Sequence, residues 1–167
     1  MIIETKRLIL RPPVLEDAEA MFLNWASDGE VTRFLSWSAH GSVEISRMII
    51  SAWVEEKGYQ WMIELKEIGE PIGSISVIEL KDGCAELGYC IGFSWWHRGI
   101  MTEAVKALID YLFAKPEIIK ITAKHDVNNP NSGGVMRKSG MIFEGIIENG
   151  GKNNTGVCDV AVYGIEK

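Results

Sequence analysis

Apolar and polar residues alternate over several short stretches of the chain, and this two-residue period is typical of β-strands with one buried face. Asp82-Gly83 is a tight-turn signal between two of these stretches, and a proline stops the first of them. The pattern predicts strands over residues 7–12, 59–66, 72–80, 84–93, 118–125, 141–148 and 155–166.

Four other stretches repeat their apolar residues at helical spacing. They predict helices over residues 16–27, about 42–57, from near Gly99 to Lys115-Pro116, and 131–140, where Gly140 is a suitable left-handed C-cap. The apolar face of the first helix comprises Ala18, Met21, Phe22 and Trp25; that of the second, Ile45, Met48, Ile49, Ala52 and Trp53; and that of the third, Ile100, Ala104, Leu108 and Tyr111 or Leu112.

The order of elements is therefore β-α-α-β-β-β-α-β-α-β-β. It predicts a mixed α/β (α+β) fold around one mostly antiparallel sheet flanked by helices, with a βαβ crossover near its middle. No internal repeat or linker interrupts the pattern, so we expect residues 1–167 to form one domain.

Composition excludes several classes of function. The formal charge of −6 argues against general binding to nucleic acid or anionic membranes, and no apolar run approaches the length of a membrane helix. The first residues lack a signal-peptide pattern. Cys84, Cys90 and Cys158 are odd in number without a CxxC spacing, and the three histidines lie far apart, so we expect a cytoplasmic protein with neither disulfides nor a metal site.

Nucleotide and hydrolase motifs are also missing. The segment "GGKNN" departs from a Walker loop at two positions, and the chain contains no G-x-G-x-x-G, G-x-S-x-G or H-E-x-x-H sequence.

Two strand-to-helix junctions carry candidate chemistry. The first, "WWHRGIMTEA" (residues 95–104), places His97, Arg98 and Gly99 at a helix start, where free backbone N–H groups favour an anion. The second, "NNPNSGGVMRKSGM" (residues 128–141), places Asn129 and Ser132 at another helix start. For each junction, an ordinary helix start with a polar cap is the alternative. Taken together, the two junctions predict a ligand between the two helices.

These segments resemble the GNAT acyl-CoA N-acyltransferase superfamily, in particular its Rim-type branch, which includes ribosomal-protein N-terminal acetyltransferases. The likeness covers nearly the whole chain: "IETKRLILRP" resembles the opening strand, "AELGYCIGFSWWHRGIMTEA" the acetyl-CoA motif, "NNPNSGGVMRKSGM" the N-x-x-S-x-x-V-x-x-K-x-G-F motif, and "GVCDVAVYGI" the final strand. Trp96 and His97 depart from the usual acetyl-CoA motif. Ile147-Glu148 stands where the branch has an arginine, which argues against a ribosomal substrate.

The resemblance implies an enzyme that moves the acetyl group of acetyl-CoA to a primary amine by direct attack, without a metal. The acceptor is a protein N-terminus or a small-molecule amine, and its identity stays open, as does the choice between monomer and homodimer. A non-catalytic CoA-binding sensor is the alternative. Acetyl-CoA is expected at Cys90, Ile91, Gly92, Phe93, Arg98, Gly99, Ile100, Met101, Thr102, Asn129, Ser132 and Lys138.

Three residues are candidates for catalysis. Ser132 is the leading general acid, because its position in the family lies near the CoA sulfur; a helix cap is the alternative. Glu86 is the first candidate base, since alternation places it on a face of small residues, although a structural or solvated carboxylate is equally consistent. Asp159 is the next candidate, with a hydrogen bond to a loop as its alternative role.

Other side chains carry weaker hypotheses. Tyr89 and Tyr163 are expected in the core or on a sheet face, with an active-site role as the alternative, and His125 is expected at the surface. An acyl-cysteine at Cys90 is a rival mechanism without an identifiable histidine partner. The substrate-side wall is expected to include Trp25, Phe34 and Trp37, with core packing as the alternative for Trp25.

Overall fold

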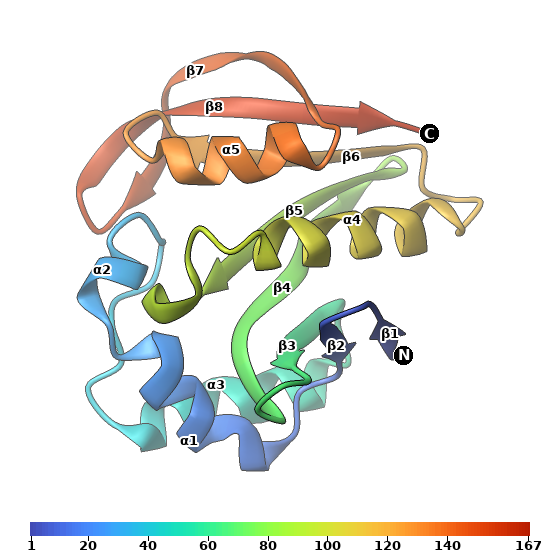
Figure 1. Ribbon diagram of the computed structural model, residues 1–167. Coiled ribbons are helices and arrows are strands. Elements are labelled where there is room, and N and C mark those ends of the chain that lie inside the picture. The colour runs from blue at the N-terminus through green and yellow to red at the C-terminus, as the bar shows by residue number, and fades with distance from the viewer.

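The computed structural model describes residues 1–167, and its eight strands form one sheet in the order β1-β2-β3-β4-β5-β6-β8-β7 (Figure 1). All neighbouring strands are antiparallel except β5 and β6, which are parallel and joined by helix α4. This is the mixed, mostly antiparallel sheet with a βαβ crossover that the sequence predicts. The strands are β1 (Ile3–Glu4), β2 (Leu8–Arg11), β3 (Gln60–Leu65), β4 (Glu70–Lys81), β5 (Cys84–Ile91), β6 (Lys120–Asp126), β7 (Ile142–Asn153) and β8 (Gly156–Glu166).

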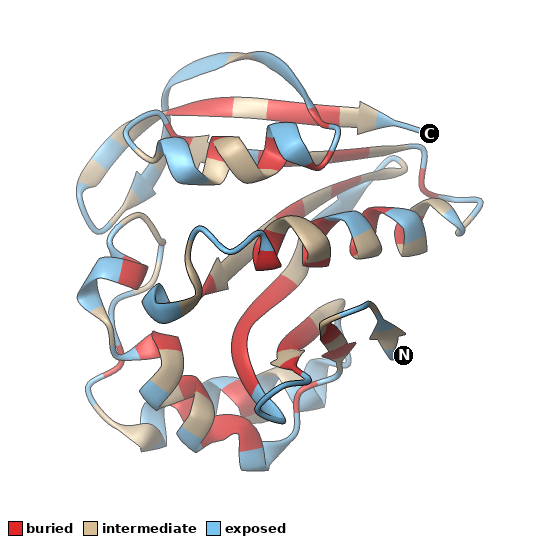
Figure 2. Cartoon of the chain, in the orientation of Figure 1, coloured by how far each residue is buried: buried red, intermediate tan, exposed pale blue.

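The two faces of the sheet bury different helices. Trp61 and Ile63 of β3 belong to the larger apolar cluster, which includes residues of α4 and α5, whereas Met62 between them belongs to a second cluster with residues of α1 and α3. Because both faces are covered, consecutive strand residues are buried, as in the continuous buried stretch of β4 in Figure 2. The helices are α1 (Ala18–Met21), α2 (Gly29–Thr32), α3 (Val43–Glu56), α4 (Ile100–Phe113) and α5 (Pro130–Lys138). No helix of the chain has the length and apolar character needed to span a membrane.

The first predicted helix is present but irregular. A 3₁₀ turn, the short α1 and a π-helical turn over Phe22–Ala26 replace one continuous helix, and Trp25 is fully buried. Asp28 follows this segment, and its carboxylate accepts a hydrogen bond from the Glu30 N–H (2.8 Å) and so caps α2. Neither α2 nor β1 is predicted by the pattern of apolar and polar residues. Gly140 has a φ of 91°, in agreement with the left-handed C-cap expected after α5.

The apolar stripe predicted for α3 is mostly wrong. Ile45, Met48 and Ile49 are exposed, with Met48 at 71%. The helix instead buries Ile50 against the second cluster and Ser46 beneath it, because the Ser46 hydroxyl is hydrogen-bonded to Nδ1 of His40 (2.8 Å). A hydrogen-bonded serine thus shares the inward face with Ile50, and of the five residues expected in the stripe only Trp53 packs against the second cluster, since Ala52 is exposed as well.

Candidate active site

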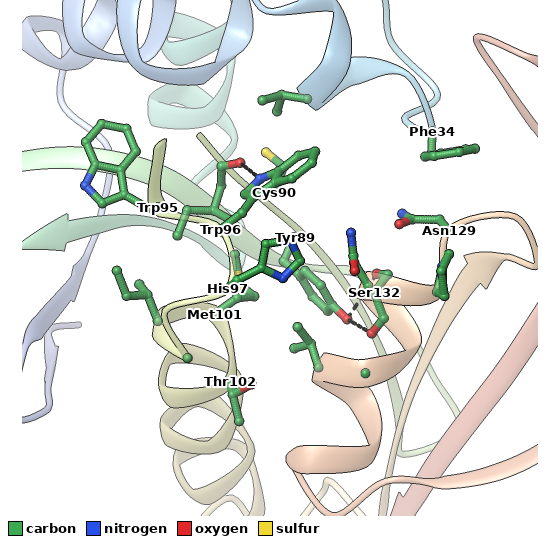
Figure 3. A pocket seen from close by; sticks show the side chains of 18 of the residues that line it. Phe34, Tyr89, Cys90, Trp95, Trp96, His97, Met101, Thr102, Asn129 and Ser132 are labelled. Atoms are coloured by element: carbon green, nitrogen blue, oxygen red, sulfur yellow. Dashed lines mark hydrogen bonds between the residues drawn. The ribbon is translucent and has the colours of Figure 1, made fainter. Parts of the chain in front are cut away.

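A cavity of about 470 Å³ opens where the two parallel strands separate. Their last paired residues are Leu87 of β5 and Ala123 of β6, so the rest of β5 is paired only with β4 (Figure 1). Tyr89–Ile91 line the cavity, together with the N-terminal ends of α4 and α5 (Figure 3). Its size suits a small ligand, and the unpaired edge of β5 leaves backbone groups available to bind an extended one.

The start of α4 has backbone N–H groups that could bind an anion. Gly99, its N-cap, has a φ of 70°, in the left-handed region that favours glycine. The backbone N–H groups of His97, Arg98 and Gly99 donate to no acceptor in the protein. Together with the free N–H groups of the first helical turn and the positive end of the helix dipole, they can bind phosphate oxygens.

An ion pair outside the cavity fixes this start of α4. Oε1 of Glu103 accepts hydrogen bonds from the Thr5 hydroxyl (2.6 Å) and the Arg7 N–H (2.9 Å), and Oε2 accepts from Nε of Arg7 (2.6 Å). Arg7 also donates to the carbonyl of Arg98 (2.9 Å). The loop before α4 is therefore anchored to the turn between β1 and β2.

Glu103→Gln is expected to lower the melting temperature by a few degrees at pH 7, because it replaces a charged acceptor of three hydrogen bonds. Burial opposes ionisation of Glu103, but its hydrogen bonds with Thr5 and Arg7 hold its pKa below the ordinary value. A carboxyl group with a lowered pKa stabilises the fold fully above its ordinary pKa and loses that effect as the pH falls through the folded pKa. Thermal unfolding at pH 7 and pH 3 should therefore show a gap that shrinks in acid.

Glu44→Gln is the control for this prediction. Glu44 lies in the first turn of α3, is exposed and makes no hydrogen bond or ion pair. Its substitution measures the effect on stability of removing a carboxylate that lies at a helix start but has no hydrogen-bond partner. Equal melting temperatures for the two variants at pH 7 would show that the Glu103 contacts do not stabilise the fold.

Trp96 and His97, the two departures from the family motif, have different placements. The indole Nε1 of Trp96 donates to the carbonyl of Ile91 (2.8 Å), and its ring packs against both apolar clusters (Figure 3). Trp96 thereby anchors the loop before α4 to the end of β5. His97 is exposed with a φ of 60° and lines the cavity, so its side chain lies beside the anion site.

Ser132 and Tyr89 face each other between the starts of α4 and α5 (Figure 3). The Ser132 hydroxyl donates to the Tyr89 oxygen (3.3 Å), and the Tyr89 hydroxyl donates to the Ser132 carbonyl (3.1 Å). Burial raises the pKa of Tyr89 to about 12, although the hydrogen bond with Ser132 opposes the shift. The phenol is therefore protonated at neutral pH, and the pair presents hydroxyl groups to a cavity ligand.

Cys90 is poorly suited to act as a nucleophile. It lines the cavity, but burial raises the pKa of its thiol, and the hydrogen bond with Ser74 (3.5 Å between Sγ and Oγ) only partly offsets this. The thiolate is the reactive form. No histidine is recorded among the hydrogen-bond partners of Cys90, which argues against the acyl-cysteine mechanism.

Glu86 and Asp159 lie outside the cavity. Glu86 is in the paired part of β5, where it forms an ion pair with Lys124 (2.7 Å). Asp159 accepts a hydrogen bond from the Asn149 N–H (2.8 Å), which is the loop contact given as its alternative role. Neither carboxylate touches the groups that surround Ser132, and no three His, Cys, Asp or Glu side chains lie close enough to hold a metal ion.

Most of the residues expected to bind acetyl-CoA line the cavity: Cys90, Ile91, Gly99, Ile100, Met101, Thr102, Asn129, Ser132 and Lys138. Gly92, Phe93 and Arg98 do not. A side chain at Gly92 would meet the Asn24 carbonyl at 2.2 Å, so this glycine allows a close approach of two backbone segments.

Asn129 is the N-cap residue of α5 but makes no side-chain hydrogen bond there, and the Ser132 hydroxyl is hydrogen-bonded to Tyr89. The side chains of Asn129 and Ser132 therefore do not cap the helix, which was the alternative role for both.

The wall of the cavity opposite Ser132 includes more residues than the sequence predicts. Phe34 lines the cavity as expected, but Glu30, Val31, Arg33 and Leu35 join it from α2 and the following loop. The capping signal at Asp28 was the available clue to α2. Trp25 is core, and Trp37 packs against the second cluster outside the cavity.

His125 is not a surface residue as the sequence suggested. Its ring lies beneath α5, where a side chain at Gly133 would meet Nε2 at 2.6 Å, and it stacks near Tyr163, with ring centroids 5.7 Å apart. Tyr163 is buried, in agreement with a core position. Neither residue lines the cavity.

Comparisons with known proteins agree with this geometry. A family model described as the acetyltransferase (GNAT) domain matches residues 7–142. The uncharacterized N-acetyltransferase p20 of Bacillus licheniformis is 32% identical over 98% of this chain and 94% of its own. A ribosomal-protein-serine acetyltransferase of Escherichia coli is 32% identical over 66% of this chain and 63% of its own. The fold is similar to that of RimL, a ribosomal L7/L12 α-N-protein acetyltransferase solved with coenzyme A, with a TM-score of 0.86, 22% identity, and coverage of 99% of this chain and 98% of that one.

Proposed function

Because the chain belongs to the acetyltransferase (GNAT) family and is an acetyl-CoA-dependent N-acyltransferase, we propose that its cavity binds acetyl-CoA and admits a primary amine for direct attack on the thioester. One observation carries the proposal: a single cavity joins the anion site at α4, the unpaired end of β5 and the Ser132–Tyr89 pair. This arrangement suits a ligand with a pyrophosphate, an extended amide-containing arm and a reactive sulfur.

The residues present fit each part of that substrate. The N–H groups before and within the first turn of α4 would hold the pyrophosphate. The edge of β5 beyond Leu87 would offer its unpaired backbone groups to the pantetheine arm where Cys90 and Ile91 line the cavity, and Lys138 lines the same cavity as a cationic group. The relatives named for acetyl transfer, and the RimL structure solved with coenzyme A, support this assignment.

The reaction needs a neutral amine, whose nitrogen forms the new C–N bond as the C–S bond breaks. Glu30 is the only carboxylate that lines the cavity, so we assign it the attraction of a cationic amine, with water taking the proton. A backbone N–H would stabilise the oxyanion. Ser132 would turn its hydroxyl from Tyr89 toward the departing sulfur and donate either a hydrogen bond or a proton, which it would regain from the water that takes the proton of the amine.

The acceptor that we propose is a protein N-terminus or a small-molecule amine. The ribosomal acetyltransferases among the relatives support an N-terminal amine, whereas the missing arginine near Ile147 argues against a ribosomal substrate. We further propose that residues 1–167 form one domain, supported by a sheet that includes both the first and the last strand. The three free thiols are consistent with the cytoplasmic location expected from the sequence.

Release of thiol from acetyl-CoA is expected with at least one class of primary amine. The panel should include peptides with free N-termini, polyamines, amino acids and an aminoglycoside, and each initial rate should be compared with a reaction lacking amine. Binding of CoA by calorimetry without thiol release from any amine would favour the non-catalytic sensor. A failure to bind CoA would contradict both functions.

A further inference from the structure

The turn between β7 and β8 holds one wall of the cavity through Asn154. The side-chain Nδ2 of this residue donates to the carbonyls of Thr32 and Trp37, both at 2.8 Å. Its backbone N–H donates to the carbonyl of Leu35 (3.2 Å), and its Oδ1 accepts from the Ser38 hydroxyl (3.5 Å). One residue, more than a hundred positions away in sequence, therefore ties down the irregular segment that follows α2.

The neighbouring residue, Asn153, holds the other wall. Its Nδ2 donates to Oδ2 of the buried Asp126 at the end of β6 (2.8 Å). Asp126 in turn accepts from the N–H of Asn128 through Oδ1 and from the N–H of Asn129 through its carbonyl, both at 2.8 Å. These bonds shape the loop that leads into α5 and Ser132.

The segment after α2, held by Asn154, and the loop into α5, held by Asn153, face the same cavity. Arg33, Phe34 and Leu35 line it from the segment after α2, and Asn129 and Ser132 line it from the start of α5 (Figure 3). Figure 1 shows the β7–β8 turn next to the loop after α2. Adjacent asparagines thus connect the two walls, although neither asparagine lines the cavity.

We propose that Asn153 and Asn154 are positioning residues that set the distance between two walls of the cavity. The amine-side wall is formed by residues 33–35, and the Ser132 wall is formed by the start of α5. This inference rests on the proposed acetyl transfer. Asn154 acts on the wall that contacts the amine, whereas Asn153 acts through Asp126 on the loop that carries Ser132. The two side chains should therefore affect different kinetic constants, although they are neighbours in one turn.

Asn154→Ala is expected to raise the KM for the amine about tenfold, because two short hydrogen bonds to the amine-side wall are lost, while the KM for acetyl-CoA changes less than about twofold. Asn153→Ala is expected to lower kcat about tenfold with a smaller effect on the amine KM. Steady-state thiol release measures both variants, using the amine that wild type acetylates fastest. Lys152→Ala is the matched control, because Lys152 is exposed in the same hairpin and its side chain makes no hydrogen bond or ion pair.

Amide hydrogen exchange provides a readout that does not depend on turnover. Asn154→Ala should speed exchange in residues 33–38, and Asn153→Ala should do so in residues 127–132, with Lys152→Ala like wild type in both. Equal changes in all kinetic constants, or unchanged exchange in both segments, would overturn the positioning role. If wild type releases no thiol with any amine, the proposed reaction fails, and the exchange pattern still decides whether the asparagines hold the two walls.

Discussion

Ser132→Ala is expected to lower kcat about a hundredfold while the Kd for acetyl-CoA changes less than about threefold. The hydroxyl lies in the cavity beside Tyr89, and its hydrogen bond is to the phenol and not to the backbone of α5. Its loss should therefore remove a donor to the departing sulfur without removing phosphate contacts at α4. Tyr89, whose pKa is raised to about 12, stays protonated and still donates to the carbonyl of residue 132, which limits any change in the backbone.

Ser139→Ala is the matched control on the same helix. Ser139 is the C-cap of α5, is buried, lies outside the cavity, and has a hydroxyl without a hydrogen-bond partner. Removing an unsatisfied hydroxyl should leave stability equal or improved and turnover unchanged. Thiol release and calorimetric binding of acetyl-CoA separate the two sites. Equal kcat for the Ser132 and Ser139 variants would show that Ser132 has no part in the reaction.

The strands other than β1 were predictable because apolar and polar residues alternate along parts of them. The alternation in β3 and β5, for example, is read directly from adjacent residues and matches the faces that the structure buries. Helix α3 was predictable in extent but not in orientation. Its inward face depends on the bond between Ser46 and His40, a contact that apolar spacing does not record.

The position of the cavity depends on where two strands separate, and this explains the different placements of Glu86 and Ser132. Alternation correctly placed Glu86 on the face of β5 that carries Cys84 and Cys90. It did not indicate that Glu86 lies opposite Thr122 in the paired part of the strands, with the cavity only beyond Leu87. The position of Ser132 in the cavity was predictable from the sequence, because the family motif that contains it coincides with a helix start.

Contacts between segments that lie far apart in the chain could not be predicted from the sequence. The segment "GGKNN" departs from a phosphate loop, and its two asparagines bind Asp126 and the loop after α2. Similarly, the role of Glu103 depends on its pairing with Arg7, some ninety residues earlier in the chain. A single sequence contains no local pattern for such pairs.

Gly99→Ala is expected to weaken acetyl-CoA binding about ten- to a hundredfold, a loss of about 1.4–2.7 kcal/mol. Gly99 has a φ of 70° at the N-cap of α4, and an alanine there either carries the strain of the left-handed conformation, about 1–2 kcal/mol, or moves the loop to relieve it. Movement would turn the N–H groups of His97 to Gly99 away from a shared anion. The added methyl meets no protein atom nearer than 3.7 Å, so a clash within the protein does not explain the effect.

Gly69→Ala separates that effect from backbone strain alone. Gly69 has nearly the same φ, 66°, in the turn between β3 and β4, outside the cavity, and an added methyl there meets nothing within 4 Å. Both variants should lose similar stability on thermal unfolding, because both place an alanine in the left-handed region. Calorimetry with acetyl-CoA should then show weaker binding for Gly99→Ala alone. Equal affinity in the two variants would mean that the start of α4 does not hold the pyrophosphate, and the anion would have to bind elsewhere in the cavity.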